Sequence, residues 1–223
     1  MGQERPRNTT RQREAGLAAR QETRRRLLQA AAEEFGERGY AQATVSRIAA
    51  RAGVTVQTLY LSWGSKRALL RAYEQAALSG RWDQEFPGRD LPAAITAGLQ
   101  DAGADPRQAI KQIAHLYRQV TERANLGWKL YRDAAATDPQ IAQDWHELQH
   151  LRRETFAHLI GRLPTEALRP GLTRASAIDT AWAIASPETY ELMVRTAGYT
   201  TDAYEQWVTA TLTSSLLADQ NPA

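Results

Sequence analysis

Two very short helix patterns separated by a glycine turn constrain this chain more than any other feature. Residues 44–53 read TVSRIAARAG and residues 55–63 read TVQTLYLSW. Each pattern begins with a threonine, which is a favoured N-cap residue, and each is followed by a glycine, which commonly ends a helix. Two short helices joined by a tight turn that contains glycine are typical of a helix-turn-helix, so we predict that unit here.

Longer helical patterns flank the short pair. Order is expected to begin near Gln21, and Gly39 stands where a C-cap glycine would end a first helix. After Gly64 the segment KRALLRAYEQAAL predicts another helix. Residues 21–75 are therefore expected to form a compact helical domain. The apolar residues that recur at helical spacing in the first helix are Leu27, Leu28, Ala31, Ala32 and Phe35.

The charge of the chain is unevenly distributed. Residues 1–75 carry 14 basic and 7 acidic side chains, whereas residues 76–223 carry 14 basic and 18 acidic ones. A basic first third indicates a polyanionic partner, and nucleic acid is favoured over a membrane because the apolar positions there look like core. Residues 1–20 contain five arginines and almost nothing apolar, so we expect a disordered basic arm.

Composition excludes several classes of protein. The 223 residues include no cysteine, which rules out disulfides, cysteine-based metal centres and a thiol nucleophile. The N-terminal sequence MGQERPRN lacks the apolar core of a signal peptide, and no run approaches the roughly 18 apolar residues of a membrane span. We therefore expect a soluble, cytoplasmic protein without a membrane partner.

The rest of the chain follows a helical pattern, and no strand pattern competes with it. Several prolines stand where they would open a helix in its first turn, among them Pro106, Pro139 and Pro187. The predicted fold is all-α, with residues 76–223 forming a larger helical domain behind the helix-turn-helix domain. The predicted helices cover residues 92–102, 106–123, 125–137, 139–162, 174–185, 187–196 and 202–218.

The residue types in the first third resemble a known family. Residues 23–70, TRRRLLQAAAEEFGERGYAQATVSRIAARAGVTVQTLYLSWGSKRALL, are similar to the DNA-binding domain of TetR-family transcriptional regulators. This resemblance implies a dimeric repressor that small ligands release from DNA. The matching positions include Phe35, Gly39, Thr44, the Ile48-Ala49 pair, Gly53-Val54, Leu59-Tyr60, Lys66 and Leu69-Leu70.

The resemblance and side-chain chemistry together indicate the DNA contacts. Thr44, at a helix N-terminus, and Lys66 are expected to bind phosphate. Gln57 suits bidentate pairing with adenine, and Leu61 stands where contact would be with a thymine methyl group or with nothing. The alternative is that these side chains only solvate a helical surface. The full set of predicted DNA-binding residues is Thr44, Thr55, Val56, Gln57, Thr58, Tyr60, Leu61 and Lys66.

For the second domain the resemblance implies ligand binding among the middle helices and dimerisation through the last two long ones. Two apolar stripes fit such an interface, although ordinary core within one chain would produce the same stripes. The first consists of Ile178, Ala181, Trp182 and Ala185, and the second of Tyr204, Trp207, Val208, Leu212 and Leu216.

Aromatic residues predict the character of the ligand. An aromatic lining with a few polar tips favours an apolar or aromatic small molecule over a highly charged one, and no cofactor is required. Aromatics at helical spacing are also common in cores, so that interpretation stays open. The candidate ligand-binding residues are His115, Tyr117, Trp128, Tyr131, Trp145, Trp182, Tyr190 and Met193.

One motif suggests a different class of function. His146-Glu147-Leu148-Gln149-His150 spells H-E-x-x-H, in which a metallopeptidase places two zinc ligands and a general base on one helix. A zinc site needs a third ligand and an open cleft, and the polar flanks and the lack of strands favour a plain amphipathic helix. The sequence therefore predicts a non-enzymatic, homodimeric regulator that binds a palindromic duplex operator, with a helical metal-binding protein or zinc hydrolase as the alternative.

Overall fold

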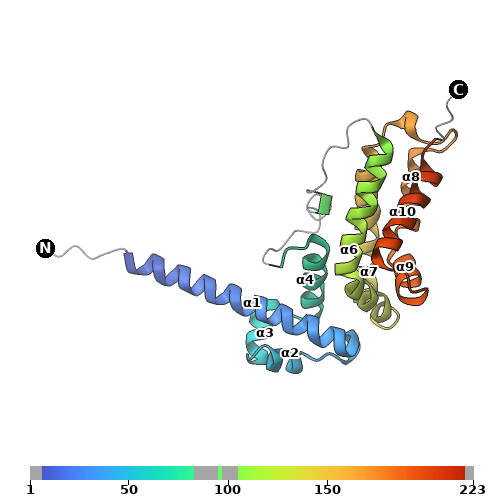
Figure 1. The fold of residues 1–223 in the computed structure, drawn as a ribbon. Coiled ribbons are helices and arrows are strands. Elements are labelled where there is room, and N and C mark those ends of the chain that lie inside the picture. The colour runs from blue at the N-terminus through green and yellow to red at the C-terminus, as the bar shows by residue number, and fades with distance from the viewer. Residues whose placement is uncertain (1–6, 83–94, 97–104, 219–223) are drawn as a thin grey trace. The chain divides into compact units, whose positions relative to one another are not determined.

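The structure, a computed structural model, describes residues 7–82, 95–96 and 105–218 (Figure 1). The described part is helical, and its one β-type pairing is an isolated antiparallel bridge between Leu168 and Leu217. The residues fall into two compact units, 1–74 and 75–223, with most contacts made within each unit. Within the described ranges, no helix has both the length and the apolar character needed to cross a membrane.

The first unit consists of α1 (Arg7–Gln42), α2 (Val45–Arg51), α3 (Val56–Trp63) and most of α4 (Lys66–Ser79), whose last turn belongs to the second unit. The regular geometry of α1 breaks at Gly39, whose φ of 72° is left-handed and suits glycine. The predicted helix-turn-helix is thus present, with α2 and α3 at the predicted positions.

The N-terminal segment differs from the expectation of a disordered arm. Residues 7–20 continue α1 toward the N-terminus, and residues 11–20 are exposed. Residues 7–20 contain four arginines and three alanines, which are good helix formers. Because it extends a helix already nucleated by packed residues, it does not bear the cost of nucleation. Residues 7–20 are thus helical, whereas residues 1–6 of the expected arm lie outside the described residues.

Apolar side chains from all four helices meet in the core of the first unit. Leu59 of α3 is completely buried, while Leu61, two residues later, is 81% exposed. Burial of Leu59 therefore fixes which face of α3 points outward. The largest fully buried side chains in this core are Leu27, Phe35, Ile48, Leu59, Leu69 and Leu70.

The second unit contains α6 (Pro106–Ala135), α7 (Pro139–Gly161), α8 (Arg174–Ile184), α9 (Pro187–Tyr190) and α10 (Thr201–Leu216). A short 3₁₀ turn, Thr165–Ala167, precedes α8, and a π-helical segment, Glu191–Thr196, follows α9. The first-turn prolines predicted at Pro106, Pro139 and Pro187 open their helices. α6 packs on α7 and α10, and α7 packs on α8.

Two helices predicted from the sequence form one continuous helix in the structure. We expected one helix to end at residue 123 and another to begin at residue 125, but α6 is continuous through this point. Its buried face continues across the predicted break, from Val120 and Ala124 to Trp128 and Tyr131, so the apolar stripe that holds the helix is uninterrupted. The helix expected at residues 92–102 lies outside the described residues, except for residues 95–96, which are helical.

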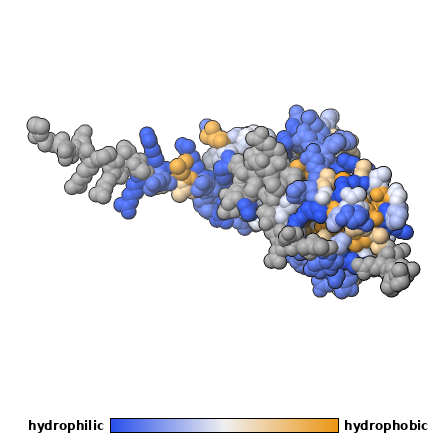
Figure 2. All heavy atoms as spheres, turned by 90° about the horizontal axis from the view of Figure 1, so that it is seen from above, coloured by the Kyte–Doolittle hydropathy of each residue, from blue (hydrophilic) through white to orange (hydrophobic). Residues whose placement is uncertain are grey.

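The stripes predicted for dimerisation lie largely within the core of the chain itself. Ala181, Ala185, Tyr204, Val208, Leu212 and Leu216 are buried in this unit and join its hydrophobic cluster. Ile178, Trp182 and Trp207 are only partly buried. In the view of Figure 2, hydrophobic residues gather on one side of the second unit, whereas the N-terminal part of α1 is mostly hydrophilic.

Candidate nucleic-acid interface and ligand pocket

The turn between α2 and α3 is tightly hydrogen bonded. The amide of Gly53 donates to the carbonyl of Ala50 over 3.0 Å, and the amide of Val54 donates to Ala49 over 3.0 Å. Gly53 has a φ of 65°, and a Cβ there would lie 2.9 Å from Nη2 of Arg26. The left-handed backbone therefore favours glycine here, which explains its place in the motif, whereas the Arg26 side chain could move aside for a Cβ.

Threonines cap the two short helices, as predicted. Oγ1 of Thr44 accepts the amide of Arg47 over 3.3 Å, and Oγ1 of Thr55 accepts the amide of Thr58 over 3.1 Å. The hydroxyls of Thr55 and Thr58 are also 2.9 Å apart. These contacts fix the start of α3, so Thr55 and Thr58 have a structural role in addition to any contact with DNA.

The outward face of α3 carries polar and apolar side chains that differ in exposure. Gln57 and Tyr60 are exposed, Tyr60 to 49%, and Leu61 is the most exposed large apolar residue on the helix. Val56 is only partly buried. The face therefore offers one amide, one phenol and one aliphatic group on a short, rigid helix, which is a composition able to contact base edges and phosphates.

The structure gives Lys66 contacts within the first unit, and the predicted phosphate contact remains a prediction. Its Nζ donates to the carbonyls of Tyr40 and Ala43 over 2.8 and 2.9 Å, and it lies 4.1 Å from the centre of the Tyr40 ring. The ammonium thus ties the start of α4 to the segment between α1 and α2. These carbonyls are more than 20 residues away in the sequence, so no local pattern could reveal them.

Other arginines of the first unit contact residues within that unit. Arg51 of α2 lies 3.2 Å from Glu33, 2.9 Å from Glu34 and 2.7 Å from Glu37, all on α1. Hydrogen bonding to Arg51 lowers the pKa of Glu37. Arg24 lies 3.8 Å from the centre of the Trp63 ring. Arg51 thereby offsets part of the negative charge of these three glutamates on α1.

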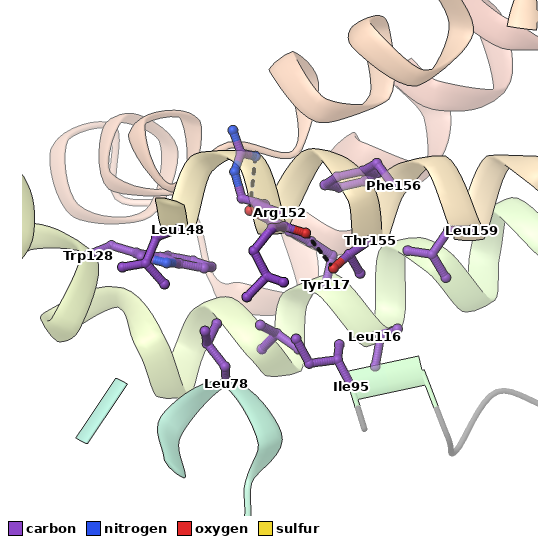
Figure 3. A pocket seen from close by; sticks show the side chains of 12 residues that line it. Leu78, Ile95, Leu116, Tyr117, Trp128, Leu148, Arg152, Thr155, Phe156 and Leu159 are labelled. Atoms are coloured by element: carbon purple, nitrogen blue, oxygen red, sulfur yellow. Dashed lines mark hydrogen bonds between the residues drawn. The ribbon is translucent and has the colours of Figure 1, made fainter. Parts of the chain in front are cut away.

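A pocket in the second unit lies between α6, α7 and the last turn of α4 (Figure 3). Its empty volume is about 440 Å³, including the space at its mouth. Nearly all of its lining is apolar, and the polar side chains are those of Tyr117, Arg152 and Thr155. The remaining lining residues are Leu78, Ile95, Leu116, Val120, Trp128, Leu148, Leu151, Phe156 and Leu159.

Only Tyr117 and Trp128 of the eight predicted ligand residues line this pocket, and their rings stack at 6.3 Å. Tyr131 and Tyr190 are core residues, while Trp145, Trp182 and Met193 pack against the core. His115 is placed on the surface, where Nδ1 lies 3.1 Å from Glu205.

The sequence analysis selected mainly aromatic residues as ligand-binding candidates. It therefore missed the aliphatic residues that make up most of the pocket lining. The α7 side of the pocket is an aliphatic stripe, Leu148, Leu151, Thr155 and Leu159, that overlaps the H-E-x-x-H motif. Helical spacing of these residues was visible, but nothing in the sequence distinguishes a stripe that lines a cavity from one that fills a core.

Arg152 organises the polar end of the pocket. Its Nη1 donates to Oη of Tyr117 over 3.3 Å and to the carbonyls of Trp182 and Ala185 over 2.8 and 3.1 Å. The guanidinium lies 4.7 Å from the centre of the Trp182 ring. Burial raises the pKa of Tyr117, and the charge of Arg152 partly offsets that rise. The side chain thus joins α6, α7 and the end of α8.

Comparison with known proteins identifies the first unit. Residues 27–73 match the family model described as bacterial regulatory proteins, tetR family. The DNA-binding unit of this chain is therefore similar to that of the tetR family. Its HTH-type relative FasR, a transcriptional activator of Mycolicibacterium smegmatis, is 31% identical over 124 residues. That match covers 55% of this chain and 52% of FasR, so the chain spans about half the length of this curated relative.

Solved structures of TetR-type regulators share the fold of the whole chain. A complex of SmeT with triclosan superposes with a TM-score of 0.67 at 18% identity, covering 89% of this chain and 93% of SmeT. NalD, the secondary repressor of the MexAB-OprM multidrug efflux pump in Pseudomonas aeruginosa, superposes with a TM-score of 0.63 at 19% identity, covering 89% and 98%. At this identity the likeness shows the fold alone.

The H-E-x-x-H motif lies on an exposed part of α7. His146, Glu147 and His150 are all exposed, and Glu147 accepts a hydrogen bond from Gln143 over 3.3 Å. Across the described ranges, no three histidine, aspartate or glutamate side chains lie close enough together to hold a metal ion. The zinc-hydrolase alternative therefore has no site in the described structure.

Proposed function

We propose that this TetR-family chain is a sequence-specific DNA-binding transcriptional regulator that acts in the cytoplasm as a homodimer. It represses transcription from a palindromic operator and is released by an apolar or aromatic small molecule. Catalysis has no part in this function. The proposal rests on the outward face of α3. This face exposes Gln57, Tyr60 and Leu61, while Leu59 on the opposite face is completely buried.

Each exposed residue of α3 has a defined part in the proposed contact. Gln57 has an amide that pairs with N6 and N7 of adenine in the major groove. Leu61, at 81% exposure, presents an apolar group that fits a thymine methyl. Tyr60 and Thr44 reach phosphates, and the exposed basic helix of residues 11–20 adds further phosphate contacts.

The position of α4 supports coupling between ligand and operator. α4 begins at Lys66, directly after α3, and its last turn supplies Leu78 to the pocket wall. Arg123 of α6 donates to the carbonyls of Ala77 and Leu78 over 3.1 and 3.3 Å, which anchors that turn to the regulatory core. A ligand that displaces Leu78 therefore acts on the same helix that follows the DNA-reading helix.

Partly exposed apolar residues support a dimer interface near the C-terminal helices. Trp182 and Trp207 are half-buried, and Leu192, in the π-helical segment, is 59% exposed. A palindromic operator requires two recognition helices related by a two-fold axis, so a dimer through this region would present two copies of α3.

Capture of sheared genomic DNA by the purified chain, followed by sequencing, tests the proposed function. We expect a few fragments to be strongly enriched, each with an inverted repeat. The control is Leu61→Asp, which should retain the fold because the position is exposed, and should lose enrichment because a carboxylate repels DNA. Uniform recovery of all fragments by the wild-type chain would contradict the proposal.

A further inference from the structure

Several buried polar atoms near the pocket have no hydrogen-bond partner within the described residues. They are Oη of Tyr204, Nε1 of Trp182 and Oγ1 of Thr121, although the Thr121 hydroxyl also lies close enough to that of Tyr117 to lower the Tyr117 pKa. Thr121 and Tyr204 are completely buried. A buried hydroxyl without a partner destabilises the folded state, so folded proteins rarely retain several of them without a water or a ligand to satisfy them.

None of these three residues lines the pocket, but each lies beside a residue that does: Thr121 and Tyr204 lie near Tyr117, and Trp182 lies against Arg152. Thr121 follows Tyr117 by one turn of α6, on the same face, and both side chains are buried. The ring of Tyr204, on α10, packs edge-on against Tyr190 at 5.1 Å. Burial raises the pKa of Tyr204, and the nearby phenols of Tyr117 and Tyr190 add to that rise. Tyr117 itself lines the pocket and therefore connects the unsatisfied hydroxyls to it.

The groups at this end are rich in donors. Arg152 can only donate, and within the described residues no carboxylate lies within 4.0 Å of its guanidinium nitrogens. Nε1 of Trp182 is a donor only, and the hydroxyls of Tyr117, Thr121 and Tyr204 can each donate. Such a set is complementary to an oxygen that accepts several hydrogen bonds, and a cation would be repelled by the guanidinium.

We propose that the polar end of the pocket binds the acceptor oxygen of an amphipathic ligand, a carbonyl or carboxylate attached to an apolar body. Tyr117, Thr121 and Tyr204 supply hydroxyls to this oxygen, and Arg152 supplies positive charge. The apolar body lies along the leucines of α6 and α7 (Figure 3). The proposal rests on the proposed ligand-responsive function only for its biological consequence, since binding itself is measured without DNA.

Calorimetric titration of the full chain with three probes of equal chain length tests the ligand class. Octanoate carries an anionic acceptor, methyl octanoate carries an uncharged acceptor, and octylammonium carries a cationic donor. We expect both acceptors to bind and octylammonium to bind at least about tenfold more weakly. Tighter binding of octanoate than of the ester identifies a carboxylate as the natural head group, and the reverse identifies a carbonyl. Equal affinity for all three probes, or no binding of either acceptor, overturns the proposal.

Variants separate the proposed contact from a buried water. Thr121→Val and Tyr204→Phe remove these hydroxyls while preserving shape, so Tyr204→Phe should leave the melting temperature unchanged or raise it and Thr121→Val should change it little. Each should weaken binding of the better acceptor probe by about tenfold. Thr155→Val is the matched control, because that hydroxyl lines the pocket but already donates to the carbonyl of Leu151 over 2.9 Å.

Unchanged affinity in both Thr121→Val and Tyr204→Phe would show that only water occupies this end, and would overturn the proposal. Operator binding by the same preparations is measured separately. Intact DNA binding without acceptor binding would reject the ligand site while leaving the proposed regulator intact. Acceptor binding without any DNA binding would reject the proposed regulator and leave the ligand site standing.

Discussion

Lys66 at the start of α4 both donates a hydrogen bond to the carbonyl of Tyr40 and lies 4.1 Å from the centre of the Tyr40 ring. With its second bond to Ala43, the ammonium fastens α4 to the end of α1. The lysine predicted to hold DNA thus holds the DNA-binding unit together, and mutation there is expected to act first on stability.

We predict that Lys66→Met destabilises the chain by about 1.5–3 kcal/mol, because it leaves two carbonyls without a charged donor. Urea unfolding followed by circular dichroism measures this loss. Arg47→Met is the matched control, since Arg47 is exposed and its replacement should change stability by less than about 0.5 kcal/mol. If Lys66→Met has full stability but a smaller salt dependence of DNA binding, then the phosphate contact is the main role of Lys66.

Glu74 predicts a pH dependence of stability. Both of its carboxylate oxygens are buried without a hydrogen-bond partner in the described structure, and burial raises its pKa well above the usual 4.5. The folded state therefore holds this proton more tightly than the unfolded state. Its contribution to stability is present below the usual pKa and is lost as the pH rises through the raised one.

Accordingly, Glu74→Gln should be more stable than the wild type near pH 8 and should lose this advantage toward about pH 5. Thermal unfolding at both pH values measures the difference. Glu34→Gln is the contrasting variant, because Glu34 is buried 2.9 Å from Arg51 and its loss should destabilise the chain at pH 8. A parallel pH response of wild type and Glu74→Gln would show that Glu74 is not the responsible group.

Local signals made the helix-turn-helix predictable. The threonine caps at Thr44 and Thr55 and the glycine turn at Gly53 each act within a few residues, so their spacing can be read directly from the sequence. The bonds of Lys66 and Arg152 join carbonyls that are distant in sequence, and no pattern encodes them. The same limit applies to the pocket, whose lining resembles ordinary core until the helices are placed.

The helical extension of α1 gives a prediction that differs from that of a disordered arm. Deleting residues 1–20 should reduce the helical circular dichroism, because residues 7–20 are helical. It should leave the melting temperature nearly unchanged, because residues 11–20 are exposed. DNA affinity should fall, and more so at low salt, because arginine contacts to phosphate are lost. Unchanged affinity at low salt would show that the extension takes no part in binding.

Trp207 is expected to contribute to the dimer interface. It is half-buried, and its ring stacks on that of Tyr204 at 6.3 Å. Trp207→Asp would put a carboxylate into a dry interface at a cost of several kcal/mol, so the variant should sediment as a monomer. Gln206→Asp, at the exposed neighbouring position, should remain a dimer. A folded Trp207→Asp dimer would place the interface elsewhere.

The most direct measurement of the central claim is selection of bound duplexes from a random DNA pool, performed with the wild type and with Gln57→Ala. The wild type should enrich an inverted repeat. Gln57→Ala should lose about 1–3 kcal/mol of specific affinity and relax preference at one base pair in each half-site, while its affinity for random DNA stays the same. Failure of the wild type to enrich any repeat, or equal losses on specific and random DNA for Gln57→Ala, would contradict base reading by α3.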